Sequence, residues 1–324
     1  MDTLGLKVPI MQAPVGSAAT AQLASEVTRA GGLGALGASW TDPEVLREKI
    51  RSIQRVTDRS FCVNLVLDFE QDERLEVALE ESAPVLSFSF GLRPNLVTHA
   101  RAGGARVLAQ VGSADAARAA AAAGADAMIV QGGGHVQSVV GLLPLLAEVR
   151  RAVSLPLLAA GGIGDVASAR AVLAGGAVAA VMGTRFVASD ESGAHQRCKA
   201  RLVQAAARDT VLTDLFDVGW PESPHRVIRN STYKQWECAG NPPSGERPGE
   251  GDEVARGVLR YAPDAPLAGT EGDIEAMAMY ASQSVGAIAE VEPAGAIVER
   301  FAAGLRNGSA SPRGRRRAGA PTGP

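Results

Sequence analysis

Short apolar runs alternate along much of the chain with longer, alanine-rich stretches in which charged residues recur at helical spacing. This alternation predicts strand–helix units whose strands lie parallel in one sheet. Eight such units fit within the first 208 residues. The expected strands are residues 9–14, 33–37, 61–67, 85–91, 106–112, 127–132, 156–163 and 179–186.

The stretches between these runs carry signals that start and stop helices. One stretch opens with Ser113, a residue type that caps helix N-termini well, and another opens with Asp165 and closes into Gly175. The helices expected on this basis include residues 113–123, 142–153, 165–174 and 195–208.

Eight units within about 208 residues favour a closed barrel, because barrels of eight strand–helix units commonly run to about 250 residues. An open doubly wound sheet of eight strands would be unusual at this length. We therefore predict an α/β protein with a (β/α)8 TIM barrel in residues 1–208.

The remainder of the chain has a different pattern. Residues 241–252 are rich in Pro, Gly and acidic side chains and predict an exposed loop, whereas residues 273–289 and 293–305 are expected to be helices. We assign residues 209–305 to a C-terminal cap and substrate region over one face of the barrel. Residues 306–324 combine arginines with Gly, Ser, Ala and Pro, which predicts a disordered basic tail.

Composition and charge narrow the range of partners. A net charge of −3 gives no global electrostatic reason to expect nucleic acid as a partner. The three cysteines are odd in number and form no CxxC pair, which argues against a disulfide framework or a zinc site. The sequence has neither a signal peptide nor an apolar stretch that would span a bilayer. We expect a cytoplasmic protein with reduced thiols.

Glycines follow the seventh and eighth expected strands, where TIM barrels often bind phosphate. Gly162 and Gly164 lie in an AGGIG segment before a helix, and Gly183 and Thr184 lie in an MGTRF segment. Glycines let the backbone approach a phosphate closely, and N–H groups at a helix start supply donors. The same glycines could merely form tight turns, but two adjacent strand ends of this kind favour phosphate binding.

His135 is the leading catalytic candidate. It follows three glycines at the end of the sixth expected strand, the edge of a barrel where catalytic groups gather. A histidine can take or give a proton near neutral pH. The other histidines, His99, His195 and His225, are expected to be ordinary surface or core residues.

The remaining strand ends offer small or amide residues, among them Ala13, Pro14, Asn64 and Gln110. Amides suit the edge of a flavin, which presents both hydrogen-bond donors and acceptors. No strand end carries paired carboxylates or a His/Asp cluster, so metal-dependent hydrolysis and glycosidase chemistry are disfavoured. Cys62 lies inside the third strand without an activating neighbour and is discounted as a nucleophile.

Several segments, in this order, carry a resemblance to a known family: PIMQAPVGSAATAQLASEVTRAGGLGALG, VNL, SFSFG, GADAMIVQGGGH, AAGGIGDVASARAVLAGGAVAAVMGTRF and YASQSVGAI. The chain resembles the nitronate monooxygenases, formerly called 2-nitropropane dioxygenases, over nearly its whole length apart from the basic tail. The resemblance implies non-covalent FMN and assigns the catalytic role to His135. The FMN contacts that the resemblance implies are Asn64, Gln110, Gly162, Gly164, Gly183, Thr184, Gln283 and Ser284. Ala13, Pro14 and Gly132 are further cofactor-binding candidates because they lie at strand ends.

Two departures from the family pattern stand out. The family usually has a longer segment before its catalytic histidine, which is shortened here to QGGGH, and its usual AGQ is ASQ at residues 281–283. The first departure leaves the substrate open.

The resemblance implies a reaction of alkyl nitronates or nitroalkanes with O2 that gives a carbonyl compound and nitrite. Two alternatives remain open. Flavin-dependent reductases that use NAD(P)H to reduce an enoyl thioester or a quinone share these motifs, and a barrel that binds phosphate ligands need not be redox-active at all. The expected partners are a small-molecule substrate and O2, with no membrane and a homodimer as one possible assembly.

Overall fold

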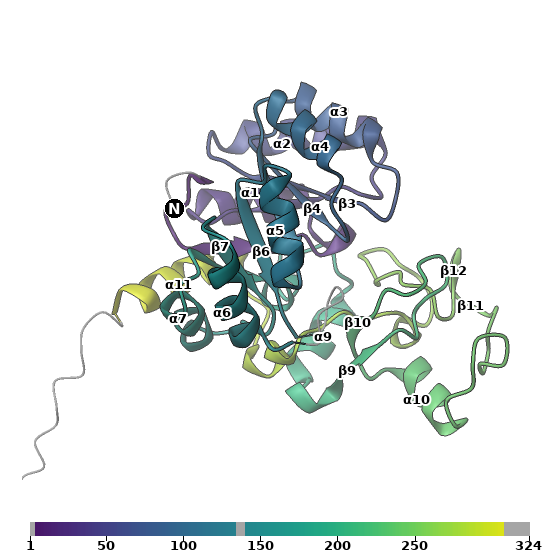
Figure 1. The fold of residues 1–324 in the computed structure, drawn as a ribbon. Coiled ribbons are helices and arrows are strands. Elements are labelled where there is room, and N and C mark those ends of the chain that lie inside the picture. The colour runs from purple at the N-terminus through teal and green to yellow at the C-terminus, as the bar shows by residue number, and fades with distance from the viewer. Residues whose placement is uncertain (1–3, 134–139, 308–324) are drawn as a thin grey trace, which may run out of the picture.

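The computed structural model describes residues 4–133 and 140–307 (Figure 1). Its main sheet contains eight parallel strands. They are β1 (Ile10–Gln12), β2 (Ala35–Gly37), β3 (Cys62–Val66), β4 (Val85–Ser89), β5 (Arg106–Val111), β6 (Ala127–Gln131), β7 (Leu157–Ala160) and β8 (Ala179–Met182). The helices that follow them are α1 (Ala21–Arg29), α2 (Pro43–Val56), α3 (Asp72–Glu80), α4 (Pro94–Ala102), α5 (Ala114–Ala122), α6 (Leu142–Ala152), α7 (Val166–Ala174) and α8 (Thr184–Val187).

The sheet closes into a barrel between its first two strands. The strands follow the order β1-β8-β7-β6-β5-β4-β3-β2, and Met11 of β1 forms an isolated parallel bridge with Leu33, just before β2. The side chain of Gln12 reinforces this seam, because its Oε1 accepts a hydrogen bond from the N–H of Ala35 at 2.7 Å. The predicted (β/α)8 barrel is therefore confirmed.

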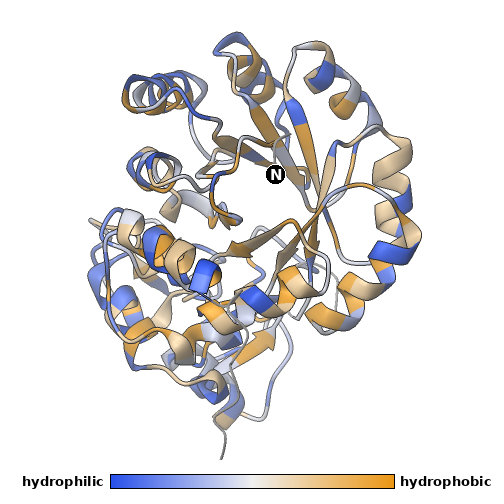
Figure 2. Cartoon of the chain, turned by 90° about the vertical axis from the view of Figure 1, so that its left-hand side faces the viewer, coloured by the Kyte–Doolittle hydropathy of each residue, from blue (hydrophilic) through white to orange (hydrophobic). Residues whose placement is uncertain are grey.

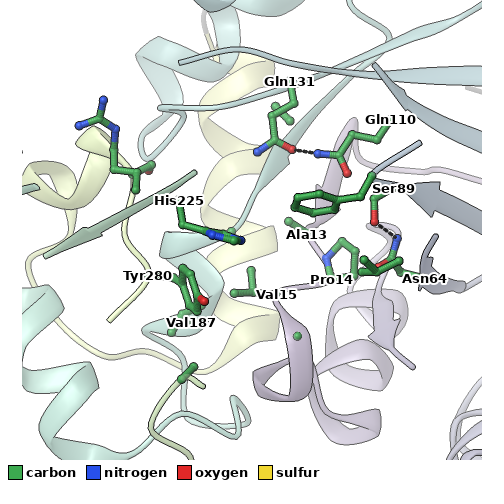
Figure 3. Close-up of a pocket in the computed structure, with 18 of the residues that line it drawn as sticks. Ala13, Pro14, Val15, Asn64, Ser89, Gln110, Gln131, Val187, His225 and Tyr280 are labelled. Atoms are coloured by element: carbon green, nitrogen blue, oxygen red, sulfur yellow. Dashed lines mark hydrogen bonds between the residues drawn. The ribbon is translucent and has the colours of Figure 1, made fainter. Parts of the chain in front are cut away.

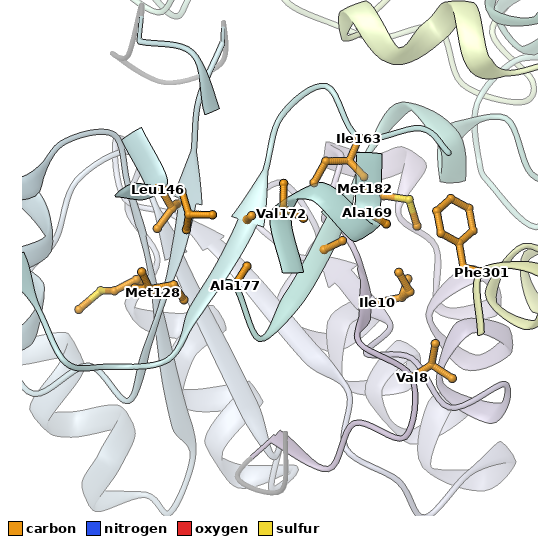
Figure 4. Packing of buried hydrophobic residues seen from close by; sticks show 14 of the residues in the cluster. Val8, Ile10, Met128, Leu146, Ile163, Ala169, Val172, Ala177, Met182 and Phe301 are labelled. Atoms are coloured by element: carbon orange, nitrogen blue, oxygen red, sulfur yellow. The ribbon is translucent and has the colours of Figure 1, made fainter. Parts of the chain in front are cut away.

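The strands are buried on both faces, which explains their nearly continuous apolar runs. Inward-facing side chains such as Cys62, Leu108 and Leu158 form one cluster inside the barrel. Outward-facing side chains such as Met128 of β6 pack with helix residues such as Leu146 of α6 and Val172 of α7 in one apolar cluster (Figure 4). Figure 2 shows the helices arranged around the sheet.

Two of the predicted helix starts have the expected caps. The hydroxyl oxygen of Ser113 accepts a hydrogen bond from the N–H of Ala116 at 3.1 Å. Asp165 accepts from the N–H of Ser168 at 2.7 Å, and Ser168 Oγ accepts from the N–H of Asp165 at 3.2 Å. This reciprocal capping box fixes the first turn of α7, directly after β7.

Three predicted elements end three or more residues earlier than the sequence pattern indicates. The strand expected over 156–163 stops at Ala160, because the chain turns through Gly161 and Gly162, both at positive φ. The strand expected over 179–186 stops at Met182, because the chain turns at Gly183 into the short helix α8. The helix expected over 195–208 consists of α9 (Gln196–Gln204) and, after a break, the 3-10 turn η3 (Ala207–Asp209).

Residues 209–305 form short elements beside the barrel and then return to it (Figure 1). They are β9 (Thr210–Thr213), β10 (His225–Ile228), α10 (Ser231–Cys238), β11 (Glu253–Ala255), β12 (Val258–Leu259), η4 (Ile274–Ala276), η5 (Gln283–Ala287) and α11 (Ala294–Asn307). Residues 241–252 form turns with mostly exposed side chains, as predicted.

The helix expected over 273–289 is a wrong prediction. The segment is extended between the 3-10 turns η4 and η5, and it pairs with β10 through hydrogen bonds from the N–H of Ile228 to the carbonyl of Met279 and from the N–H of Ala281 to the carbonyl of Arg226. This tertiary pairing overrides the local helical preference of an alanine- and methionine-containing segment.

The last helix, α11, packs against the outside of the barrel. Its residues Ile297, Val298 and Phe301 belong to the apolar cluster that also contains Ile10 of β1. α11 lies beside α7, where a Cβ on Gly304 would come within 2.6 Å of Val166. The helix runs to Asn307, two residues beyond its predicted end, and the rest of the predicted tail lies outside the described residues. Within the described ranges, no helix is long and apolar enough to cross a membrane.

Candidate active site

A cavity of about 510 Å³ opens at the carboxyl ends of the barrel strands (Figure 3). Its floor is formed by residues at the ends of β1 and β3–β8. Its outer wall includes residues 218–220, 225–226, 263–265, 267 and 280–282. This is the edge at which TIM barrels hold their ligands. The volume is within the range of pockets that enclose small molecules.

Most of the sequence-predicted cofactor contacts line this one cavity. They are Ala13, Pro14, Asn64, Gln110, Gly132, Gly162, Gly183 and Thr184. Gly164, Gln283 and Ser284 are not among its lining residues. A Cβ on Gly164 would lie 2.8 Å from Cβ of Ser284, so the glycine allows η5 to pack against the start of α7. His135 lies outside the described residues.

The ends of β7 and β8 present a group of backbone donors. Gly162 has a φ of +72°, and a Cβ at this position would meet no atom within 4 Å, so the backbone is open to the cavity. Among the described residues, the N–H groups of Gly162, Ile163 and Gly183 donate no hydrogen bond to another protein group. The start of α7 follows directly, and its dipole adds positive potential. These features suit a phosphate.

Three hydroxyl groups join the end of β8 to the C-terminal region. Thr184 Oγ1 accepts a hydrogen bond from the N–H of Ser282 at 2.9 Å and donates to Ser282 Oγ at 3.1 Å. Ser282 Oγ is 2.6 Å from Ser284 Oγ. Thr184 and Ser284 were predicted from the sequence, whereas Ser282, which lines the cavity, was not.

Neutral amides form another part of the wall. Nδ2 of Asn64 donates to Ser87 Oγ at 2.9 Å and to the carbonyl of Ser87 at 3.1 Å, which fixes the orientation of the amide. Nε2 of Gln110 donates to Oε1 of Gln131, the last residue of β6 (Figure 3). A wall of oriented, uncharged amides suits a neutral heterocycle that offers both donors and acceptors.

His225 is a site residue that the sequence analysis placed in the ordinary surface or core class. It begins β10, is 2% exposed, and lines the cavity. Burial lowers the pKa of its imidazole to about 4, so the side chain is neutral near pH 7. The preceding segment, ESPH, offers no strand-end position or glycine turn that would have singled it out.

Two further residues of the outer wall, Arg226 and Tyr280, were also missed. Arg226 Nη1 donates to Thr210 Oγ1 at 3.3 Å and its Nε donates to the carbonyl of Gly133 at 3.4 Å. Burial lowers the pKa of Arg226, but an arginine remains charged at neutral pH. The hydroxyl of Tyr280 donates to the carbonyl of Pro263, and burial raises the pKa of this phenol. Among the described residues, the cavity lining therefore includes two groups that are neutral near pH 7, His225 and Tyr280, the cation of Arg226 and the acidic side chain of Asp264.

Cys62 is excluded as a nucleophile by its surroundings. Its side chain is buried in the barrel interior, and burial raises the pKa of its thiol to about 12. Because the thiolate is the reactive form, this side chain is inert at neutral pH.

Comparison with known proteins agrees with this arrangement. A sequence model described as nitronate monooxygenase matches residues 1–73 and 67–304. The chain is 35% identical over 242 residues to a Mycobacterium tuberculosis protein named (3aS,4S,5R,7aS)-5-hydroxy-7a-methyl-1-oxo-octahydro-1H-indene-4-carboxyl-CoA dehydrogenase, covering 73% of this chain and 67% of the relative.

Two solved structures share the fold over nearly the whole chain. FabK from Thermotoga maritima is similar with a TM-score of 0.82 and 35% identity, covering 95% of this chain and 96% of FabK. The nitroalkane oxidase from Streptomyces ansochromogenes is similar with a TM-score of 0.77 and 31% identity, covering 95% of this chain and 98% of the oxidase.

Proposed function

The chain belongs to the nitronate monooxygenase family and is an FMN-dependent oxidoreductase; on this premise, we propose that it binds FMN in the barrel cavity and oxidises nitronates with O2. In the net reaction, two nitronate anions and one O2 give two carbonyl compounds and two nitrite ions. When bound, FMN supplies the electron acceptor for the nitronate and the route of those electrons to oxygen.

One observation supports FMN as the cofactor more than any other. The same cavity combines unpaired backbone donors at the ends of β7 and β8 with oriented neutral amides at the ends of β3, β5 and β6. A phosphate attached to an uncharged heterocycle requires both features. Gly162, Gly183 and Thr184 would hold the phosphate, whereas Asn64 and Gln110 would contact the ring or the ribityl chain.

Of the two charged residues that line the described part of the cavity, Arg226 suits an anionic substrate, whereas Asp264 does not. Arg226 provides positive potential toward a nitronate, and a cation near a buried site raises the rate at which anions enter it. His225, neutral near pH 7, can exchange a hydrogen bond with a substrate oxygen without adding a charge to the cavity. His135 remains the candidate that takes a proton from a neutral nitroalkane, an assignment that rests on the sequence.

The test is a visible absorption spectrum of the purified protein under anaerobic conditions, before and after addition of ethyl nitronate, with NADH in a parallel cell. We expect flavin bands that bleach with the nitronate and persist with NADH. After air is admitted, nitrite release should match nitronate consumption. A flavin-containing protein that releases no nitrite would overturn the proposal.

A second candidate function is supported by the comparisons. FabK and the CoA-thioester dehydrogenase are each 35% identical to this chain, so the same site could act on an enoyl or acyl thioester with a nicotinamide cofactor. Bleaching by NADH or NADPH alone, followed by recovery when an enoyl thioester is added, would favour this reaction. Membership of the family argues against the non-redox alternative.

A further inference from the structure

The outer part of the cavity is lined by a continuous group of aromatic rings, which we call the aromatic wall. Its members are Trp40, Phe69, Phe90, Trp220, His225 and Tyr280. Neighbouring rings lie at centroid distances between 4.7 and 6.0 Å. Their planes meet at 53° to 69°, except for Phe90 and His225, which meet at 34°. Aromatics make up only 4% of the chain, so their concentration around one cavity is a specific feature of this site.

Trp220 joins the two halves of the aromatic wall. Its ring lies 4.7 Å from Phe90 and 5.2 Å from Phe69, both in loops after barrel strands, and 5.0 Å from His225 of β10. The indole is held in place because its Nε1 donates to Asp68 Oδ2 at 2.9 Å. Trp220 is therefore a fixed surface that connects the barrel to the C-terminal region.

Trp40 extends the aromatic wall toward solvent. Its ring lies 5.6 Å from Phe69 and 5.8 Å from Trp220, yet 48% of the residue is exposed. A tryptophan that remains half-exposed beside a cavity is a surface that an apolar ligand can cover. An apolar ligand can therefore contact the aromatic wall at its exposed outer end, at Trp40, as well as at its buried base.

The aromatic wall and the amide wall serve different parts of a ligand. Figure 3 shows His225 and Tyr280 on one side of the cavity and Asn64, Ser89 and Gln110 on the other. The amides suit the cofactor, which leaves the aromatic wall facing the space for the substrate. Arg226 lines the same space and can pair with a negatively charged group.

We propose that the substrate of this site is a compact anion carried on a flat apolar ring, such as an aryl nitronate, rather than a small alkyl nitronate. This inference rests on the proposed function for the nitronate group, while the ring specificity rests on the aromatic wall. Rings that pack edge to face gain energy beyond their buried area, which a short alkyl chain cannot match.

The test measures binding separately from turnover. Carboxylates share the planar, anionic shape of a nitronate, so benzoate and propionate are titrated into the FMN-loaded protein and followed by tryptophan fluorescence and by the flavin spectrum. We expect benzoate to bind about ten-fold more tightly than propionate. Equal affinities would overturn the inference.

Matched variants test whether the aromatic wall causes the preference for benzoate over propionate. Trp220→Leu should reduce the benzoate-to-propionate ratio to about three-fold or less, and Trp40→Leu should lower it in the same direction. Trp236→Leu is the control, because this tryptophan packs on Tyr233 in α10 and is not among the residues lining the cavity. Should Trp220→Leu not fold, Trp40→Leu decides, since its exposed side chain can be replaced without opening the core. An unchanged ratio in the folded variants contradicts the assignment.

Measurements of turnover distinguish a failure of the ring preference from a failure of the proposed function. The nitronates of phenylnitromethane and nitroethane are compared by nitrite release. Nitrite from both with equal kcat/KM would overturn the ring preference and leave the proposed function standing. A strong benzoate preference without nitrite from either would overturn the proposed function and leave the ring preference standing.

Discussion

The imidazole of His225 lies 5.1 Å from the phenol ring of Tyr280, at an angle of 63° between the ring planes. His225 begins β10 and Tyr280 lies in the extended segment that pairs with this strand. The edge-to-face contact therefore depends on the pairing of two C-terminal segments. It places a buried histidine and a half-buried tyrosine together in the lining of the cavity.

The buried state of His225 predicts a pH-dependent stability. Its folded pKa is about 4, against 6.5 for an exposed histidine, so unfolding takes up a proton between these values. The free energy of unfolding should therefore fall as the pH falls from 6.5 to 4, by up to about 3 kcal/mol from this residue. Urea unfolding at several pH values should show a shallower dependence in His225→Phe. The exposed His99, changed to Phe, is the control, and identical slopes in all three proteins would contradict the prediction.

A methyl group at Gly162 should prevent cofactor binding. Gly162→Ala would place its Cβ in the open space beside the unpaired donors, where the phosphate is expected. Gly104 is a matched control, because it also has a positive φ, +88°, and open space around it, but it does not line the cavity. Both variants should lose about 1 kcal/mol of stability. FMN retention measured after gel filtration should be lost only in Gly162→Ala; retention in both would remove this glycine from the phosphate site.

Removal of the Thr184 hydroxyl should weaken FMN binding and loosen the C-terminal region. Thr184→Val leaves the N–H of Ser282 without its acceptor and removes one donor toward a phosphate. We expect FMN affinity to fall about ten-fold in a fluorescence titration, with a loss of about 1–2 kcal/mol of stability. Thr98→Val is the control, since this exposed hydroxyl only donates to the carbonyl of Pro94. Unchanged affinity in Thr184→Val would show that the hydroxyl does not contact the cofactor.

His135 should be required for turnover and dispensable for the cofactor. A residue that transfers a proton in the transition state contributes at least about a hundred-fold in rate. We expect His135→Ala to lose that much kcat on a neutral nitroalkane while its flavin content stays the same. His99→Ala serves as the comparison. Full activity of His135→Ala would reassign the proton transfer to another group.

The barrel was predictable because its pattern is local. Each strand is a short buried run and each helix has its own start signal, as Asp165 and Ser113 illustrate. The strand-end residues Asn64 and Gly162 could be named for the same reason, since a barrel brings all strand ends to one edge. Their individual roles toward FMN and the assembly as a homodimer stay predictions.

The residues of the outer wall could not be predicted from local sequence patterns. The conformation around His225, Arg226 and Tyr280 depends on pairing between segments 51 to 55 residues apart, as between Ile228 and Met279, rather than on local preference. The helix expected over 273–289 failed for the same reason. A sequence pattern predicts what a segment prefers alone, whereas these residues depend on a partner far along the chain.

The position of β1 has a consequence for how this protein is made. Its main partner is β8. Ile10 pairs with Ala180, which is synthesised 170 residues later. Until then, the first strand has local contacts only, among them the Met11–Leu33 bridge, the hydrogen bond of the Gln12 side chain and packing on α1. Contacts so distant in sequence slow folding. The nascent chain therefore carries an apolar strand with an unpaired edge through most of its synthesis. Until β8 is made, the chain avoids aggregation only if this edge is covered.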